Sequence, residues 1–180
     1  MYTLHIANKN YSSWSLRPWV LMKELGIEFN EQLIVFGDEP TWQAYRRLSP
    51  SGKVPCLTDE STTVWDSLAI IEYLAERHEG VWPKNVKARA WARCAAAEMH
   101  SGFQSLRDIC SMNVGLRIRM NTVSEGLQKD VDRIDSLWSH GLQQFGGPFL
   151  AGDRFSAVDA FFAPVVYRVR TYGLDLSEGA

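Results

Sequence analysis

The sequence predicts an α/β domain followed by an all-α domain, and three observations support that prediction. Short stretches of β-forming residues alternate with helical patterns through roughly the first 80 residues. Strand patterns then cease, and residues 79–85 form a linker rich in turn-forming residues. Segments with apolar residues three and four positions apart follow. The predicted domains are therefore residues 1–78 and 86–180.

The first domain is predicted to have the element order β-α-β-α-β-β-α. The stretch YTLHIA at 2–7 predicts a strand, and a helix follows the serine run, with Pro18 in its first turn and Gly26 at its end. The other predicted elements are a strand at 32–36, a short helix at 41–48, strands at 55–59 and 62–65, and a helix at 67–77.

The second domain is predicted from helical periodicity. An Ala-rich segment predicts one long helix over 86–112, and a second helix is predicted over 124–145. A third helix begins at Ser156. Ser156 and Asp159 have the S-x-x-D spacing of a capping box, and Phe155 occupies the position of a hydrophobic staple.

Composition and charge narrow the class of protein. Hydrophobic residues are 46% of the chain, so a substantial core can form. A net charge of −2 without Lys or Arg clusters argues against a nucleic-acid or anionic-membrane partner. The N-terminus lacks signal-peptide features, and no apolar run reaches the roughly 18 residues of a membrane span. Three scattered cysteines and four histidines without ligand-like spacing predict a cytoplasmic protein with no metal site.

Three features of the first domain could carry chemistry. Ser12 and Ser13 lie at a strand-to-helix junction, where backbone N–H groups and the helix dipole favour an anion. Val54 precedes a proline, and a cis bond there would expose its backbone to an extended peptide. Asp66 and Ser67 precede an apolar helix and could take the ammonium and carboxylate of an amino acid. Each feature alone is also explained as a helix cap or a strand start, and the cap is favoured for the serine pair.

Four segments, in this order, resemble the cytosolic glutathione S-transferase superfamily. They are YSSWSLRPWVLMKELGIEF, GKVPCL, WDSLAIIEYLAER and FLAGDRFSAVDAFFAP, and the resemblance covers essentially the whole chain. It implies a thioredoxin-like N-terminal domain, a helical C-terminal domain, glutathione as co-substrate, and a homodimer. The stretch SSWSLR is most similar to the serine-type classes, especially zeta with its S-S-C-S-x-R motif, and Trp14 replaces the cysteine of that motif.

The resemblance also implies which group contacts the glutathione sulfur. Ser12 matches the serine that hydrogen-bonds the sulfur, with Ser13 as second choice and Tyr11 as third. A hydrogen bond to a charged group contributes roughly 1.5–3 kcal/mol. At about 1.36 kcal/mol per pKa unit, that bond lowers a thiol pKa by roughly one to two units. The serine therefore needs only to donate a hydrogen bond, without a histidine base.

The remaining glutathione contacts are assigned by the same resemblance. Val54 matches the residue before the family's cis proline, whose backbone pairs with the cysteinyl part of glutathione. Asp66 and Ser67 match the pair that holds the γ-glutamyl head. Lys53 matches a basic residue that some classes use on the glycyl carboxylate.

The pocket for the electrophile is predicted between the two domains, against the long helix. Met99, Phe103 and Arg107 share one face of that predicted helix and are the predicted wall, with core packing as the competing interpretation for the first two. Thr171 stands where zeta isomerases carry an arginine. Relatives usually continue for another helix or two beyond the equivalent of LDLSEGA, which leaves open a truncated C-terminal domain.

The predicted function is a glutathione transferase that activates the glutathione thiolate for attack on an electrophilic small molecule. The alternatives are a glutathione-dependent isomerase resembling maleylacetoacetate isomerase, a peroxidase, or a non-catalytic transferase-like binding protein. The chain keeps the residues assigned to these glutathione contacts, which are Lys53, Val54, Asp66 and Ser67. Their presence argues against loss of the glutathione site. No cysteine lies near Ser12, which disfavours disulfide reductase chemistry.

Overall fold

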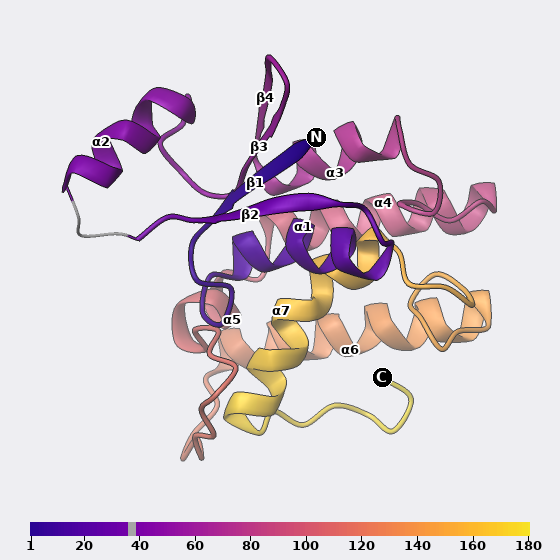
Figure 1. Cartoon of the computed structure of the whole chain (residues 1–180). Helices are drawn as coiled ribbons and strands as arrows, with labels where there is room; N and C mark the ends of the chain where they lie inside the picture. Colours follow the sequence, from indigo (N-terminus) through magenta and orange to yellow (C-terminus); the bar gives the residue numbers. More distant parts are fainter. Residues whose placement is uncertain (36–38) are drawn as a thin grey trace. The chain divides into compact units, whose positions relative to one another are not determined.

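The computed structural model describes residues 1–35 and 39–180, with the side chains of 39–41 left out of the description (Figure 1). The chain divides into two compact units, Met1–Val81 and Trp82–Ala180. The boundary between them falls inside the segment 79–85, where the sequence predicts a linker.

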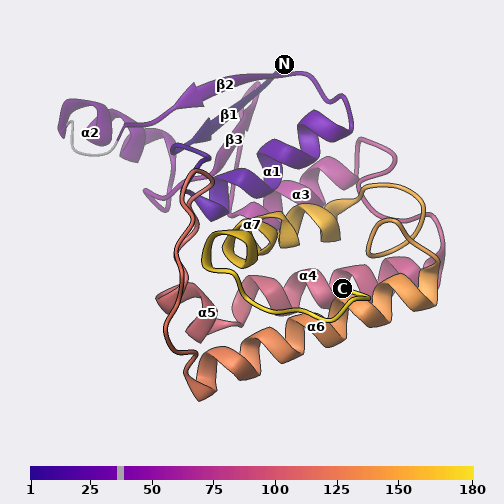
Figure 2. The same cartoon turned by 90° about the horizontal axis from the view of Figure 1, so that it is seen from below.

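The described residues of the first unit form a sheet and three helices in the predicted order β-α-β-α-β-β-α. The strands are β1 (Tyr2–Ile6), β2 (Phe29–Leu33), β3 (Cys56–Asp59) and β4 (Thr62–Trp65). The helices are α1 (Ser13–Glu24), α2 (Glu39–Leu48) and α3 (Ser67–Ala75). Helices α1 and α3 pack against each other on one face of the sheet (Figure 2).

The strand order in the sheet is β2-β1-β3-β4, with β1 and β2 parallel and the other two pairs antiparallel. The register aligns His5, Cys56 and Trp65 in one row across the sheet. At this row the chain leaves β1, enters β3 and leaves β4, so three connections emerge at the same end of the strands. This end of the strands is the edge of the sheet marked by His5, Cys56 and Trp65. The thioredoxin-like fold predicted for this unit is confirmed.

The predicted position of the second strand, at 32–36, is wrong by three residues. The strand is 29–33 and pairs along its whole length with β1. This strand is an outermost strand of the sheet and is mostly exposed, so its polar residues cost little stability. The apolar residues that suggested the later position are therefore not needed in the strand. Ile34, just beyond the strand, packs with Tyr45 in a buried cluster. Phe36 lies outside the described residues.

The second unit contains α4 (Val86–Ser101), α5 (Gln104–Ile109), α6 (Glu125–Phe145) and α7 (Ala157–Tyr172). The prediction of a single helix over 86–112 is wrong, because α4 ends before Gly102, which is extended, and Phe103 has a left-handed φ of 60°. The Arg107 side chain stabilises this break. Its Nε donates to the Gly102 carbonyl at 2.8 Å, and its guanidinium also donates to the Met99 carbonyl, so two carbonyls at the end of α4 gain partners.

The predicted capping box at the start of α7 is present. The backbone N–H and hydroxyl of Ser156 donate to Oδ2 of Asp159, at 2.8 and 3.1 Å. The other oxygen of Asp159 accepts from the N–H of Leu150 at 2.9 Å. Burial raises the pKa of Asp159 although these hydrogen bonds oppose the shift. No helix within the described residues is long and apolar enough to cross a membrane.

Candidate functional site

The segments predicted to bind a ligand meet at one edge of the sheet. Residues 8–12 follow β1, residues 53–55 precede β3, and residues 66–67 follow β4. The row that contains His5, Cys56 and Trp65 marks this edge, so all three segments leave or enter the sheet side by side. The edge lies entirely within the first unit.

Ser12 is the N-cap residue of α1, but its side chain does not cap the helix. Its backbone N–H donates to the Asn8 carbonyl at 2.8 Å. Its hydroxyl donates instead to Oγ of Ser15 at 2.9 Å, and that oxygen also accepts from the N–H of Ala7 at 3.1 Å. Ser15 therefore holds the hydroxyl of Ser12 near the first N–H groups of α1, where no acidic residue offsets the helix dipole. The sequence pointed to Ser12 but missed Ser15, which sets the orientation of its hydroxyl.

The neighbours of Ser12 differ in exposure. Ser13, the first residue of α1, is buried, whereas Tyr11 is 59% exposed. Arg17 is fully buried, and its Cζ lies 4.4 Å from the ring centroid of Trp14, within cation–π distance. Trp14 therefore packs on the arginine of the motif at the position where the zeta motif has a cysteine.

The Val54–Pro55 peptide bond is cis. The carbonyl of Lys53 accepts hydrogen bonds from the Tyr45 hydroxyl at 2.7 Å and from the Ser49 hydroxyl at 3.1 Å, which fixes the backbone just before Val54. Burial raises the pKa of Tyr45 to about 12, so this phenol remains a donor at neutral pH. Within the described part of the chain, the N–H and carbonyl of Val54 have no hydrogen-bond partner.

Sequence reasoning missed Tyr45 and Ser49 as supports of this loop. Both side chains are buried. Their positions four residues apart, at the end of a short helix before the SPSGK turn, were the signal that could have identified them. The Lys53 side chain itself is exposed.

Asp66 and Ser67 begin α3. Asp66 is the N-cap residue, and its Oδ1 accepts from the N–H of Leu68 at 2.8 Å. Its φ of 69° is unusual for a residue other than glycine, and such conformations concentrate at functional sites. The Ser67 hydroxyl is fully buried and has no hydrogen-bond partner among the described residues. An unsatisfied buried hydroxyl costs about 1–3 kcal/mol, which a ligand oxygen at this position would recover.

The three residues predicted to wall a second-substrate pocket lie at the break between α4 and α5. Met99 and Phe103 are buried, and the Arg107 guanidinium donates to the backbone carbonyls at the end of α4. Burial also lowers the pKa of Arg107. They do not share the face of one continuous helix, which was the basis of the prediction, and their role toward a second substrate stays a prediction.

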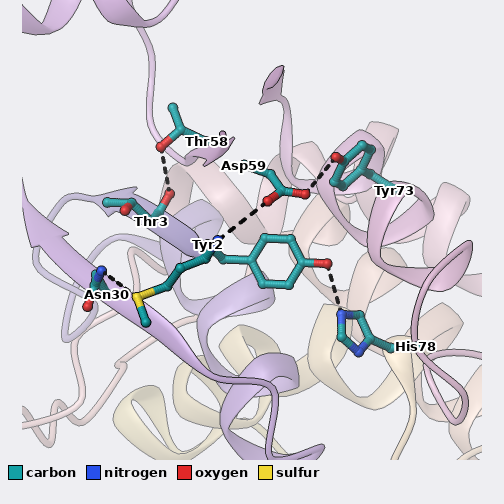
Figure 3. Close-up of polar contacts among 8 residues, drawn as sticks. Tyr2, Thr3, Asn30, Thr58, Asp59, Tyr73 and His78 are labelled. Carbon is teal, nitrogen blue, oxygen red and sulfur yellow. Dashed lines mark hydrogen bonds and ion pairs between the residues drawn. The ribbon is translucent and has the colours of Figure 1, made fainter. Parts of the chain in front are cut away.

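The opposite end of the strands, the edge of the sheet marked by Tyr2 and Asp59, carries a different polar cluster (Figure 3). The Tyr2 hydroxyl and Nε2 of His78 lie 2.9 Å apart, and the Tyr73 hydroxyl donates to Asp59 at 2.9 Å. Tyr2 and Asp59 are register partners in β1 and β3. The first contact joins β1 to the segment after α3, and the second joins α3 to β3, so this cluster attaches α3 and the segment after it to the sheet.

A thioredoxin-like unit followed by an all-helical unit, with a serine at the start of α1 and a cis proline before β3, defines a protein of the glutathione transferase class. Family models described as the N-terminal and C-terminal domains of glutathione S-transferase match residues 11–77 and 118–179. The chain belongs to the glutathione S-transferase family.

Similar proteins carry two kinds of name. The chain is 28% identical to the probable maleylacetoacetate isomerase of Caenorhabditis elegans, over 92% of this chain and 77% of the relative. It is 26% identical to glutathione S-transferase 1 of Dianthus caryophyllus, over 92% of this chain and 76% of that protein. A crystal structure of a glutathione transferase homologue from Burkholderia, with bound glutathione, superimposes with a TM-score of 0.71 at 22% identity. That match covers 98% of this chain and 85% of the Burkholderia chain and establishes the fold.

Proposed function

We propose that the chain binds glutathione at the edge marked by His5, Cys56 and Trp65 and activates its thiol with Ser12 for attack on an electrophilic small molecule. The observation that carries this proposal is the buried Ser67 hydroxyl, which has no partner among the described residues at the same edge as Ser12. A binding site needs such spare hydrogen-bonding capacity, and glutathione offers matching groups along its length.

Each part of glutathione has a complementary group at this edge. The Asp66 carboxylate pairs with the ammonium of the γ-glutamyl head, and the Ser67 hydroxyl donates to its carboxylate. The backbone N–H and carbonyl of Val54 pair with the cysteinyl residue. The exposed Lys53 ammonium takes the glycyl carboxylate, while its own carbonyl is fixed by Tyr45 and Ser49.

Activation of the thiol requires one exchange of hydrogen bonds. The Ser12 hydroxyl turns from Ser15, a neutral contact contributing about 0.5–1.5 kcal/mol, to the sulfur, a charged contact contributing about 1.5–3 kcal/mol. The N-terminus of α1 adds about 0.3–1 kcal/mol. The thiol proton passes to solvent, and the thiolate then forms a carbon–sulfur bond as the electrophile takes up the electron pair. Ser13 is the second choice for this contact and Tyr11 the third.

A glutathione-dependent isomerase is the second candidate function, because the relative from Caenorhabditis elegans is named as one. Thr171 weighs against it, since zeta isomerases carry an arginine there. Thr171 is buried, and its hydroxyl donates to the Asn113 carbonyl at 2.7 Å, so the side chain is already engaged. A peroxidase and a non-catalytic binding protein rank below the isomerase, because neither of the two relatives named above carries such a name.

The proposal includes a homodimer in the cytoplasm. The family resemblance supports the dimer. The three free cysteines, of which Cys94 is exposed, support a reducing compartment.

Glutathione titration followed by tryptophan fluorescence, paired with a conjugation assay, tests the proposal. Wild-type protein should bind glutathione saturably. Ser12→Ala should still bind but lose about 10–100-fold in turnover, which corresponds to one to two pKa units of lost thiolate stabilisation. Ser139→Ala, in the second unit, is the matched control. Absence of saturable binding would remove the transferase proposal, and unchanged turnover in Ser12→Ala would move the role to Ser13 or Tyr11.

A further inference from the structure

The connection from α2 to β3, residues 49–55, carries the Val54 backbone that the proposed function assigns to the cysteinyl part of glutathione (Figure 1). The hydroxyls of Tyr45 and Ser49 donate to the Lys53 carbonyl in this connection, at 2.7 and 3.1 Å. We propose that Tyr45 and Ser49 are positioning residues, which aim the Val54 N–H at the cysteinyl carbonyl of glutathione. This role rests on the glutathione site proposed above.

The Lys53 carbonyl and the Val54 N–H belong to one peptide unit. That unit is planar and trans, so the carbonyl and the N–H point in opposite directions. Because the carbonyl faces the hydroxyls of Tyr45 and Ser49, the N–H points away from them. The two hydroxyls therefore fix the direction of the Val54 N–H through the residue that precedes it.

Both backbone groups of Lys53 are held by side chains. Its carbonyl oxygen has two lone pairs, and the hydroxyls of Tyr45 and Ser49 use both of them. Its N–H donates to Oγ of Ser51 at 3.2 Å. The Val54 N–H is the next donor along the chain, and it has no hydrogen-bond partner in the described part of the chain. A held residue therefore precedes a donor that is ready for a ligand.

Burial protects the two hydroxyl contacts from competition with water. Tyr45 is 3% exposed, and Ser49 is fully buried. The Tyr45 ring packs in a cluster with Ile34 and Cys56, and its centroid lies 6.3 Å from that of His5. These contacts hold the hydroxyl of Tyr45 relative to the sheet as well as to α2. Burial raises the pKa of Tyr45 to about 12, so the phenol stays a donor over the range in which a thiol titrates.

A purely structural role accounts for only one of the two hydroxyls. A partly buried carbonyl needs one partner to avoid the cost of an unsatisfied acceptor, and the Lys53 carbonyl has two. The second partner restricts rotation of the peptide plane. Direction matters to a ligand, because a hydrogen bond weakens steeply once its angle falls below about 120°. The pair of hydroxyls is therefore suited to aiming a donor.

The positioning role makes a prediction about one atom of the ligand. The Val54 N–H donates to the cysteinyl carbonyl oxygen of glutathione, whereas the Val54 carbonyl, in the next peptide unit, accepts from the cysteinyl N–H. The hydroxyls of Tyr45 and Ser49 act on the first of these bonds. Their loss should therefore weaken only ligands that carry the cysteinyl carbonyl, while a general loss of folding would weaken every ligand of the site.

Isothermal titration calorimetry of the full chain with three ligands tests the positioning role. The ligands are glutathione, γ-glutamylcysteinamide, which keeps the cysteinyl carbonyl, and γ-glutamylcysteamine, which lacks it. Tyr45→Phe should weaken binding of the first two by about three- to tenfold, the size of one neutral hydrogen bond, and leave the third unchanged. Ser49→Ala should give the same pattern. The double variant Tyr45→Phe/Ser49→Ala should lose more affinity for the first two ligands than either single variant.

Tyr73→Phe is the matched control, because it removes a tyrosine hydroxyl that bonds to Asp59 at the other end of the strands. It should lower the melting temperature and leave all three affinities unchanged. Equal losses for the three ligands in Tyr45→Phe, or no loss for any of them, would overturn the positioning role and leave the glutathione site in place. Absence of glutathione binding by the wild type would remove the proposed function and this role with it. Thermal melting identifies variants that fold, and Tyr45→Phe, which keeps the ring, decides the result where the double variant is unstable.

Discussion

The two edges of the same sheet, one at each end of its strands, carry similar polar residues that have different roles. At the edge of Tyr2 and Asp59, each side chain bonds to a neighbour, to His78 and Tyr73 respectively (Figure 3). At the other edge, the Ser67 hydroxyl has no partner among the described residues. Polarity alone therefore does not distinguish a binding edge from a structural one. Spare hydrogen-bonding capacity does, because a buried group without a partner is stabilised when a ligand supplies one.

Removing one hydroxyl from the binding edge should give the largest effect on affinity. Ser67→Ala should weaken glutathione binding by about 10–100-fold, since a bond to a charged carboxylate contributes roughly 1.5–3 kcal/mol. The free energy of unfolding should stay constant or rise, because the variant removes an unsatisfied buried group. Calorimetric titration and urea unfolding measure the two quantities. A large loss of stability in Ser67→Ala with unchanged glutathione affinity would show that Ser67 has a structural role and does not bind the ligand.

Removing one hydroxyl from the opposite edge should give the converse result. Tyr2→Phe breaks the contact with His78, so the free energy of unfolding should fall by about 0.5–1.5 kcal/mol. Glutathione affinity should not change, because the contact lies at the far end of the strand. Urea unfolding beside the same titration checks this, and a loss of affinity in Tyr2→Phe would show that the two edges are not independent.

Two variants of Asp66 separate its structural role from its charge. Asparagine caps helices about as well as aspartate, so Asp66→Asn should keep α3 stable while it weakens glutathione binding. Asp66→Ala should weaken binding and also cost about 0.5–2 kcal/mol of stability, because the cap to Leu68 is lost. Equal affinity of Asp66→Asn and wild type would show that this carboxylate does not pair with the ammonium.

The smallest effect expected is a pH dependence at His5, in the row that marks the binding edge. Burial lowers the pKa of His5 in the folded protein. The unfolded chain then binds more protons, so the contribution to stability is complete above about pH 6.5 and is lost as the pH falls through the lowered folded value. Melting temperatures across this range should decline less for His5→Gln than for wild type. Identical slopes would contradict this origin of the pH dependence.

The sequence predicted the order of elements well, because the change from a period of two to a period near 3.6 is local information. It misplaced the second strand because an edge strand such as β2 tolerates polar residues, so its pattern carries little signal. It also missed the break at Gly102, since apolar spacing continues through it. The break depends on the Arg107 side chain folding back onto two carbonyls, which is a tertiary contact.

The candidate site was predictable in position and less so in detail. Ser12, Val54 and Ser67 could be named by resemblance, and strand register then brought their segments to one edge. The sequence could not show that the Ser12 hydroxyl bonds to Ser15 and leaves the helix uncapped, because serine caps and serine pairs have the same local pattern. The sequence also could not show that the Ser67 hydroxyl lacks a partner among the described residues, because this depends on how the folded chain packs.

The pKa of the thiol of bound glutathione tests the central claim most directly. Ultraviolet absorbance of the thiolate, titrated against pH in wild type and in Ser12→Ala, measures it. Wild type should hold the pKa about one unit or more below the free-thiol value of about 8.5, and Ser12→Ala should raise it by about one unit. An identical, lowered pKa in the two proteins would contradict the role assigned to the Ser12 hydroxyl.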